Sequence, residues 1–323
     1  MCALDYDPAS HLTFAASRTC VAETLILADI SRLAQIAMVF RDLFSKVVNT
    51  KSEKPAASAV QATTSSTTSP YWQADFSSST PVSANFNHET GDWGWGNNEL
   101  ENYTNSEENS FHTKNGCLVI KAIVDSKKST NKYTSARLTL KQLLGRRLGY
   151  VEAKISAPSA KGIWPAFWLL PCDPFKWPGD GEVDIMESWN GLKDNHTCLH
   201  WGSYEPSELG KHRVKQMPVS SIGKPHTYGF AWEQPEQGDG GRCVWYIDGR
   251  PVMKSSKPGG TRRFEDFRII LNVAIGGDVC NGNLPRDGTY EMKVHELKMC
   301  ESIEGGWDKF EEDWRRTREG RPM

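Results

Sequence analysis

Between about residues 71 and 300, short runs alternate apolar and polar positions, and Gly, Pro, Asn and Asp separate the runs. Alternation with a period of two places successive side chains on opposite faces of a β-strand. About nine runs follow this pattern with no helical stretch between them, which favours a sandwich of two sheets over an α/β fold. The runs include GCLVIKAIV, YVEAKISAP, GIWPAFWLLP, EVDIMESW, HTCLHWG, HTYGFAWE, CVWYIDGRPV, FRIILNVAIG and YEMKVHELKM.

The residues before this β-rich region differ in composition. Residues 21–48 mix apolar positions at helical spacing with charges, so we expect a helix within the segment 1–48, whose role is unknown. Residues 49–70 are rich in Ser, Thr and Ala and cannot bury enough apolar surface to order themselves. We therefore predict a linker at 49–70 and a folded domain at 71–300.

The tail 301–323 is charged and carries three aromatic residues, Trp307, Phe310 and Trp314, at helical spacing. This spacing predicts a short helix that docks on the domain.

Composition excludes several classes of partner. The net charge is −2 with acids and bases mixed along the chain, so we expect neither a nucleic-acid partner nor a membrane surface. The 8 Cys form no CxxC pair and no Cys/His metal spacing, so the linear sequence predicts no zinc site and leaves the disulfide state open. The 12 Trp favour aromatic platforms as well as core packing. We expect a monomer.

The N-terminus does not resemble an ordinary secretory signal. It begins MCALDYDPAS, which is acidic where a signal would be basic. The longest apolar run nearby, LAQIAMVF at 33–40, is too short to span a bilayer. The compartment therefore stays open: extracellular or cell-wall-associated if this N-terminus is mis-assigned, and cytoplasmic otherwise.

The candidate chemistry lies in the run GEVDIMES, where acids occupy positions 182, 184 and 187. On a regular strand Glu182 and Asp184 share a face, whereas Glu187 points to the opposite face. One extra residue in a β-bulge, either Ile185 or Met186, restores the parity and brings all three acids to one surface.

Three carboxyls on one face, with no Lys or Arg between them, raise at least one pKa through mutual repulsion. A glycosidase needs this asymmetry, because one acid must stay protonated while the other stays ionised. The pattern alone is also compatible with a solvated strand face or with a hard-cation site such as calcium.

The surrounding motifs resemble glycoside hydrolase family 16, in particular its laminarinase-like endo-1,3(4)-β-glucanases. The resemblance spans about residues 71–300 and rests on GNNELENYT (96–104), SARL (135–138), GIWPAFWLLP (162–171), GEVDIMES (181–188), CLHWG (198–202), YIDGRPV (246–252) and LNVAIGGD (271–278). It implies a β-jelly-roll sandwich of the concanavalin A-like lectin/glucanase type, with a concave glycan cleft. It also implies that Glu182 is the nucleophile, that Glu187 is the general acid/base, and that Asp184 tunes the ionisation of the nucleophile.

Further residues are expected around the cleft. Trp164 and Trp168 share one face of a strand, and the resemblance implies that Trp168 and Trp177 border the cleavage point; core or loop packing is the alternative for each. His200 resembles the cleft histidine of the family, against an ordinary strand histidine.

Asn98 in GNNELE and Arg137 in SARL resemble family positions that hold sugar hydroxyls, with a turn cap and an exposed charge as the respective alternatives.

One departure concerns residues 278–281, which read Asp-Val-Cys-Asn where many laminarinase-like members carry a sugar-binding Trp. This side of the cleft is therefore less aromatic. No cofactor is expected. Some family members bind a structural calcium, but the final strand has His295-Glu296 where an Asp would be the better ligand, so calcium stays open and unassigned.

We therefore predict a retaining endo-hydrolase of 1,3-β or mixed 1,3(1,4)-β-D-glucan that forms a covalent glycosyl-enzyme. The alternatives are a transglycosylase that uses the same two glutamates and a non-catalytic β-glucan-binding lectin, which the retention of both glutamates disfavours.

Overall fold

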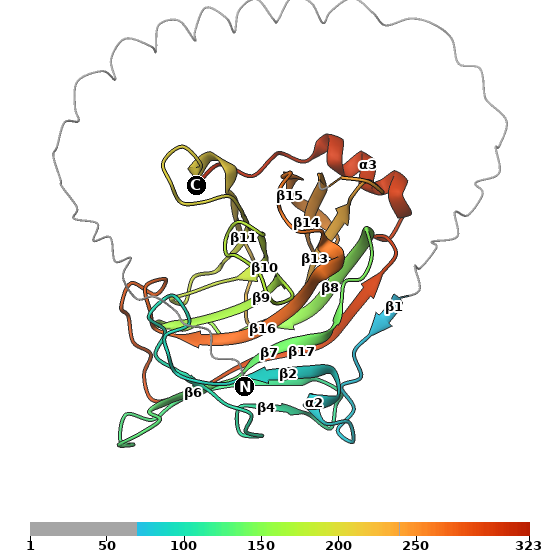
Figure 1. The fold of residues 1–323 in the computed structure, drawn as a ribbon. Coiled ribbons are helices and arrows are strands. Elements are labelled where there is room, and N and C mark those ends of the chain that lie inside the picture. The colour runs from blue at the N-terminus through green and yellow to red at the C-terminus, as the bar shows by residue number, and fades with distance from the viewer. Residues whose placement is uncertain (1–69, 239) are drawn as a thin grey trace, which may run out of the picture. The chain divides into compact units, whose positions relative to one another are not determined.

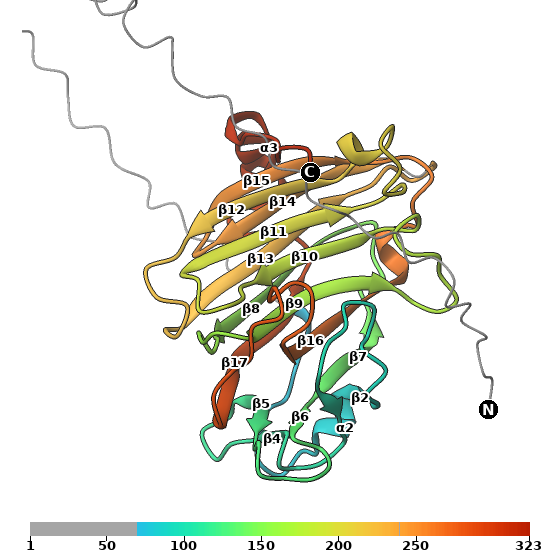
Figure 2. The ribbon, with the colours of Figure 1, turned by 90° about the vertical axis from the view of Figure 1, so that its left-hand side faces the viewer.

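The computed structural model describes residues 70–238 and 240–323, and within them two β-sheets pack face to face (Figures 1 and 2). The strands are β1 Pro70–Gln73, β2 Phe86–Glu89, β3 Asn102–Tyr103, β4 Ser110–His112, β5 Leu118–Val124, β6 Tyr133–Ser135, β7 Arg137–Leu143, β8 Leu148–Ser156, β9 Ile163–Pro171, β10 Glu182–Glu187, β11 Asp194–His200, β12 Arg213–Pro218, β13 His226–Glu233, β14 Gly241–Ile247, β15 Arg250–Lys257, β16 Phe267–Ile275 and β17 Gly288–Cys300. The helices are α2 Val82–Asn85, α3 Gly306–Arg316 and the short 3₁₀ turns η1 Leu209–Lys211 and η2 Phe264–Asp266.

One sheet has ten strands, with a main path β15-β14-β13-β8-β17-β5-β6-β3, and β1 and β4 pair with β17 and β5. The other has seven strands in the order β12-β11-β10-β9-β16-β7-β2. Neighbouring strands run antiparallel except in the short β3–β6 pair. The prediction of an all-β sandwich is confirmed.

The core lies between the sheets because the strands alternate as the sequence pattern predicts. On β16, Ile269, Leu271 and Val273 are buried in the core, while Arg268 and Asn272 point to the other face of the seven-stranded sheet. We call this other face the site face. It carries the polar side chains of β10, β9, β16 and β7.

Helix α3 lies within the charged tail and packs on the ten-stranded sheet, on the face away from the core. Phe310 is fully buried there, and Trp307 and Trp314 flank it against Tyr246 and Ile303. The helix expected in the tail is therefore present at Gly306–Arg316.

The residues that follow α3 close one edge of the sandwich. Glu319 forms a parallel bridge with Lys254 of β15, and Arg321 forms an antiparallel bridge with Val214 of β12. Both strands are the outermost members of their sheets on this side. The tail therefore occupies backbone groups that an exposed edge would leave unpaired.

A bulge in β10 decides which way its acids point. Pairing with β9 matches Asp184 to Trp168 and Met186 to Phe167, so Ile185 is the extra residue. Glu187 then pairs with Ala166, which shares a strand face with Trp168. All three acids therefore reach the site face, as predicted, while Val183, Ile185 and Met186 are buried in the core.

The bulge breaks the regular ladder, and side chains satisfy the carbonyls that it frees. The Trp245 indole, from β14 in the other sheet, donates to the carbonyl of Asp184 at 2.9 Å. Asn195 Nδ2, from β11, donates to the carbonyl of Ile185 at 3.2 Å. Because an unpaired buried carbonyl costs about 1–3 kcal/mol, these two bonds stabilise the kinked backbone.

The predicted segment 1–48 and all but the last residue of the predicted linker 49–70 lie outside the described residues. Within residues 70–238 and 240–323, no helix is both long and apolar enough to cross a bilayer.

We expect Trp245→Phe to lower the free energy of unfolding by about 1–3 kcal/mol, because the ring is kept but the Asp184 carbonyl loses its donor. We also expect turnover to fall, because the bulge that aims Glu187 is no longer fixed. Urea unfolding and steady-state kinetics measure the two effects.

Trp232→Phe is the matched control. Trp232 is equally buried and donates to the carbonyl of Arg146 at 2.8 Å, far along the chain from the acids. It should lose similar stability and keep its turnover. Equal loss of turnover in both variants would contradict a specific role for Trp245.

Candidate active site

Glu182, Asp184 and Glu187 meet on the site face, and each carboxyl has a distinct partner. The Trp177 indole donates to Glu182 Oε2 at 2.8 Å, and the Trp164 indole donates to Glu187 Oε1 at 2.9 Å. Both acids are therefore held by neutral N–H donors and not by a permanent cation. This leaves them free to exchange protons.

His200 lies beside the middle acid. Its Nε2 is 3.2 Å from Asp184 Oδ2 and 4.0 Å from Glu182 Oε1. Burial alone would lower the pKa of His200, but its contacts with Asp184 and Cys198 raise that pKa well above the usual range. The imidazolium form is favoured and supplies positive charge among the three acids.

The two outer acids differ in their affinity for a proton. Burial, followed by the charge of Asp184, raises the pKa of Glu182 to about 7. Burial and the charges of both Asp184 and Glu182 raise the pKa of Glu187 well above its ordinary value. His200 and the Trp donors oppose the rise in each case. The titration belongs to the coupled cluster, within which Glu187 is expected to hold the proton while Glu182 ionises.

The loop before β10 places Trp177 over this cluster. Trp177 is 52% exposed, and its ring lies 5.5 Å from the ring of Tyr204, centroid to centroid. Tyr204 stacks on His212 at 4.4 Å and hydrogen-bonds His200 at 2.9 Å between its hydroxyl and Nδ1. An aromatic rim therefore borders Glu182 and His200.

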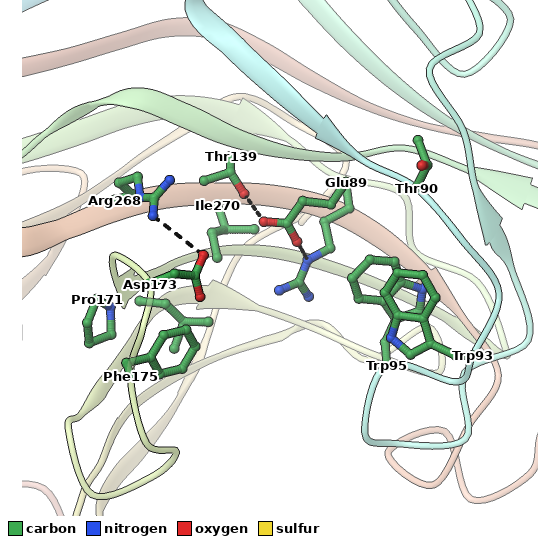
Figure 3. A pocket seen from close by; sticks show the side chains of 12 residues that line it. Glu89, Thr90, Trp93, Trp95, Thr139, Pro171, Asp173, Phe175, Arg268 and Ile270 are labelled. Carbon is green, nitrogen blue, oxygen red and sulfur yellow. Dashed lines mark hydrogen bonds and ion pairs between the residues drawn. The ribbon is translucent and has the colours of Figure 1, made fainter. Parts of the chain in front are cut away.

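A groove of about 460 Å³ lies on the site face, and its lining residues do not include the three acids (Figure 3). Trp168 links the two regions, because it pairs with Asp184 on one side and with Ile270 on the other. In Figure 3 the indoles of Trp93 and Trp95 stand on one side of the groove and Phe175 on the other. The lining is completed by Glu89, Thr90, Arg137, Thr139, Leu170, Pro171, Asp173, Arg268 and Ile270.

Arg137 lies in this groove between two indoles. Its guanidinium carbon is 4.7 Å from the ring centroid of Trp168 and 4.9 Å from that of Trp95. Its Nε donates to Glu89, which also accepts from Thr139 (Figure 3). Arg137 is thus a fixed spacer between two aromatic platforms as well as a polar lining residue.

A network of buried polar side chains fixes the orientation of Trp168. Trp168 Nε1 donates to Asn272 Oδ1 at 2.8 Å, and Asn272 Nδ2 donates to the hydroxyl of Tyr103 at 2.9 Å. Tyr103 in turn donates to Glu99 Oε2 at 3.2 Å. The indole plane is therefore set by a chain of hydrogen bonds that starts in the motif GNNELENYT.

Glu101, in the same motif, extends this network into the interior. It is fully buried, and its Oε2 accepts from the backbone N–H of Ile275 at 2.6 Å. Burial, followed by the charge of Glu99, raises its pKa well above the ordinary value and favours the uncharged acid. Spacing alone cannot separate the acids of this motif into buried and exposed, so the role of Glu101 was not predictable from the sequence.

Asn98 lies apart from the groove lining. It is exposed, has a left-handed backbone with φ of 53°, and donates through Nδ2 to Asp278 Oδ2 at 2.9 Å. Asp278 is the first residue of the stretch that replaces the family's Trp, and its backbone N–H also bonds the carbonyl of Asn97 at 2.8 Å. The amide of Asn98 thus joins two loops, and the expectation that it holds a sugar stays a prediction.

The structure brings Trp164, Trp168, Trp177 and His200 to the acids, and it places Arg137 in the adjoining groove. On the strand considered for calcium, His295 contacts Ser156 and Cys117, and Glu296 pairs with Lys298.

Sequence reasoning missed the aromatic wall of the groove. Trp93 is 66% exposed, and its ring lies 4.0 Å from that of Trp95. Two Trp in the turn-rich stretch GDWGWGNN were the available signal, because exposed aromatic residues on a short loop are seldom there for packing. Tyr204 and Phe175 carried no comparable signal.

Comparison with known proteins places this fold in one class. The family model described as "XgeA-like, catalytic GH16 domain" matches residues 101–229. The structure of endo-β-1,3-glucanase from Pyrococcus furiosus is 31% identical with a TM-score of 0.59, over 71% of this chain and 93% of that one. The structure of endo-1,3-β-glucanase from Streptomyces sioyaensis is 25% identical with a TM-score of 0.63, over 76% of this chain and 98% of that one.

The domain is thus a glycoside hydrolase jelly roll, and the chain belongs to glycoside hydrolase family 16. Among curated proteins it is 30% identical over 243 residues to glucan endo-1,3-β-glucosidase A1 of Niallia circulans. That alignment covers 66% of this chain but only 35% of the relative, and another relative, the endo-1,3-1,4-β-glycanase ExsH of Rhizobium meliloti, is covered to 41%.

We expect Asp184→Asn to shift the titrations of both Glu182 and Glu187 to lower pH, by roughly one pH unit. The charge of Asp184 raises both pKa values, and removing it makes either proton easier to lose. Carboxyl-carbon NMR of the labelled glutamates measures the midpoints, with Glu182 near pH 7 before the change.

Asp248→Asn is the control for this shift. Asp248 also forms an Asp–His pair, 2.7 Å from His226 Nδ1, but it lies at the end of the other sheet's strand β14. Its loss should leave the two glutamates unchanged. A shift of the Glu187 midpoint to higher pH in Asp184→Asn would overturn the electrostatic account.

Proposed function

We propose that this protein cleaves internal bonds of 1,3-β- or mixed 1,3(1,4)-β-D-glucan with retention of configuration. The observation that carries the proposal is the cluster of Glu182, Asp184 and Glu187 on one face of a bulged strand, beside an open aromatic groove. Relatives named endo-1,3-β-glucanase support the substrate class.

The groove supports binding of a chain of sugars. Pyranose rings have flat, partly apolar C–H faces that stack on indoles. Trp93 and Trp95 offer such surfaces in the groove, and Trp168 lies next to its lining residue Arg137. The groove is open and crosses several strands, so a chain can lie along it without presenting an end. This supports attack on internal bonds.

The division of labour between the two acids follows from their protonation. Glu187 donates its proton to the glycosidic oxygen as the bond from that oxygen to the anomeric carbon breaks. Ionised Glu182 attacks the same carbon and forms a glycosyl ester, which leaves the first product free. Glu187, now ionised, takes a proton from water, and the resulting hydroxide displaces Glu182 to complete hydrolysis.

Asp184 and His200 support both steps without bonding to carbon. Asp184 raises the pKa of each glutamate, while His200 limits the accumulated negative charge. The Trp177 and Trp164 indoles hold the two carboxyls in place with one N–H each. The same machinery would serve transglycosylation if a sugar hydroxyl replaced water in the second step.

We expect Glu182→Gln to lose turnover by roughly 10³-fold or more while still binding laminari-oligosaccharides, because the amide cannot attack but the groove is intact. Reducing-sugar assays and calorimetric binding measure the two properties. Glu233→Gln, a glutamate of the other sheet that pairs with Arg242, is the control and should remain active. Normal turnover in Glu182→Gln would end the assignment.

We expect the first product released from laminarin to have the β configuration at its new anomeric centre, because two displacements restore the starting geometry. Proton NMR during the first minutes, before mutarotation, distinguishes the anomers. Parallel digests of lichenan and cellulose define the linkages cleaved. An initial α product would contradict the covalent route.

A further inference from the structure

One cysteine lies beside the acids and has no part in the proposed chemistry. Cys198 is on β11, directly opposite Asp184 in the strand register, and it points to the site face together with His200. It is 4% exposed and is one of six free cysteines in the described part of the chain.

Three different donor atoms converge at this position. The carboxylate of Asp184, the thiol of Cys198 and the imidazole of His200 each offer one atom, and these atoms lie within 4.8 Å of one another. Asp184 Oδ2 is buried and contacts His200, another of the three donors, whose Nε2 lies 3.2 Å away.

We propose that Asp184, Cys198 and His200 form a binding site for a thiophilic divalent cation such as Zn²⁺, and that occupation of this site inhibits the enzyme. Tetrahedral Zn²⁺ with bonds of about 2.0–2.3 Å places its donors roughly 3.3–3.8 Å apart. The three donor atoms here lie within 4.8 Å of one another, so binding one ion draws them closer together. The mixture of sulfur, nitrogen and oxygen donors favours Zn²⁺ over Mg²⁺ or Ca²⁺, which prefer oxygen alone.

The fourth position has donors nearby. Met323 Sδ lies 4.0 Å from Cys198 Sγ, and Glu182 Oε1 lies 4.0 Å from His200 Nε2. Met323 is 51% exposed, so a cation can approach past it from solvent. Water can also fill this position, as it does in catalytic zinc sites.

Binding and inhibition follow from ordinary coordination chemistry. The thiol and the imidazole release the protons on their coordinating atoms to solvent, and the metal takes their place. Asp184 and His200 are then held by the cation and can no longer set the charge balance of the glutamates. The inhibition rests on the proposed function, whereas the metal site does not.

The linear sequence conceals this site. Asp184 and Cys198 come from different strands, and only the register of β10 against β11 brings them together. The spacing of Cys and His along the chain therefore predicts no zinc ligands.

The test is a titration of the protein, freed of metal by dialysis against a chelator, with Zn²⁺ alone and with Mg²⁺ alone, followed by calorimetry. Co²⁺ in place of Zn²⁺ reports a bound thiolate through its charge-transfer absorption. We expect one equivalent of Zn²⁺ to bind and chelator-reversible loss of β-glucan hydrolysis. Cys198→Ser should weaken binding at least tenfold and lose the cobalt–thiolate band.

Cys117→Ser is the matched control. Cys117 Sγ lies 3.3 Å from His295 Nδ1, a second cysteine–histidine contact, and no carboxylate contact of Cys117 is recorded in the described chain. This variant should bind and respond to Zn²⁺ like the parent protein. Thermal unfolding checks each variant, and Cys198→Ala replaces Cys198→Ser if the latter does not fold.

Absence of Zn²⁺ binding, or equal binding by parent and Cys198→Ser, would overturn the metal site. Zn²⁺ binding that depends on Cys198 but leaves hydrolysis unchanged would overturn the inhibition. A protein that binds Zn²⁺ through Cys198 but never cleaves glucan would leave the site standing and contradict the proposed function instead.

Discussion

The bulge at Ile185 is the constraint on which the rest of the site depends. Without the extra residue, the period of two would turn Glu187 into the core, where its charge would be buried among aliphatic side chains. The kink is stable because Trp245 reaches across from the opposite sheet to the carbonyl of Asp184, while Asn195 serves the carbonyl of Ile185. The packing of the two sheets therefore helps to determine the direction in which the acids point.

The electrostatics of the cluster follow from what surrounds it. No Lys or Arg forms an ion pair with Glu182 or Glu187 in the described chain, and each glutamate is instead held by an indole N–H. Repulsion from Asp184 therefore raises both pKa values, and His200 offsets part of that rise. A fixed cation in place of either indole would hold its glutamate ionised and remove the proton that bond cleavage requires.

Polar contacts hold the aromatic side chains beside the groove in fixed positions. Arg137 fills the space between Trp95 and Trp168, and the hydrogen bonds from Trp168 through Asn272 to Tyr103 fix the indole. Such preorganisation reduces the ordering that substrate binding must impose. The motif GNNELENYT therefore also has a structural role, because its residues Glu99 and Glu101 are buried.

The sequence by itself determined the sandwich, the need for a bulge and the three acids, because strand alternation and the spacing of GEVDIMES are local properties. It also pointed to Trp164, Trp168, Trp177 and His200. Only the tertiary structure decided that Trp93 lines the groove, that Asn98 binds Asp278, and that Cys198 meets Asp184. These contacts join residues far apart in the chain, and their register depends on how whole strands and sheets pack, which no local pattern records.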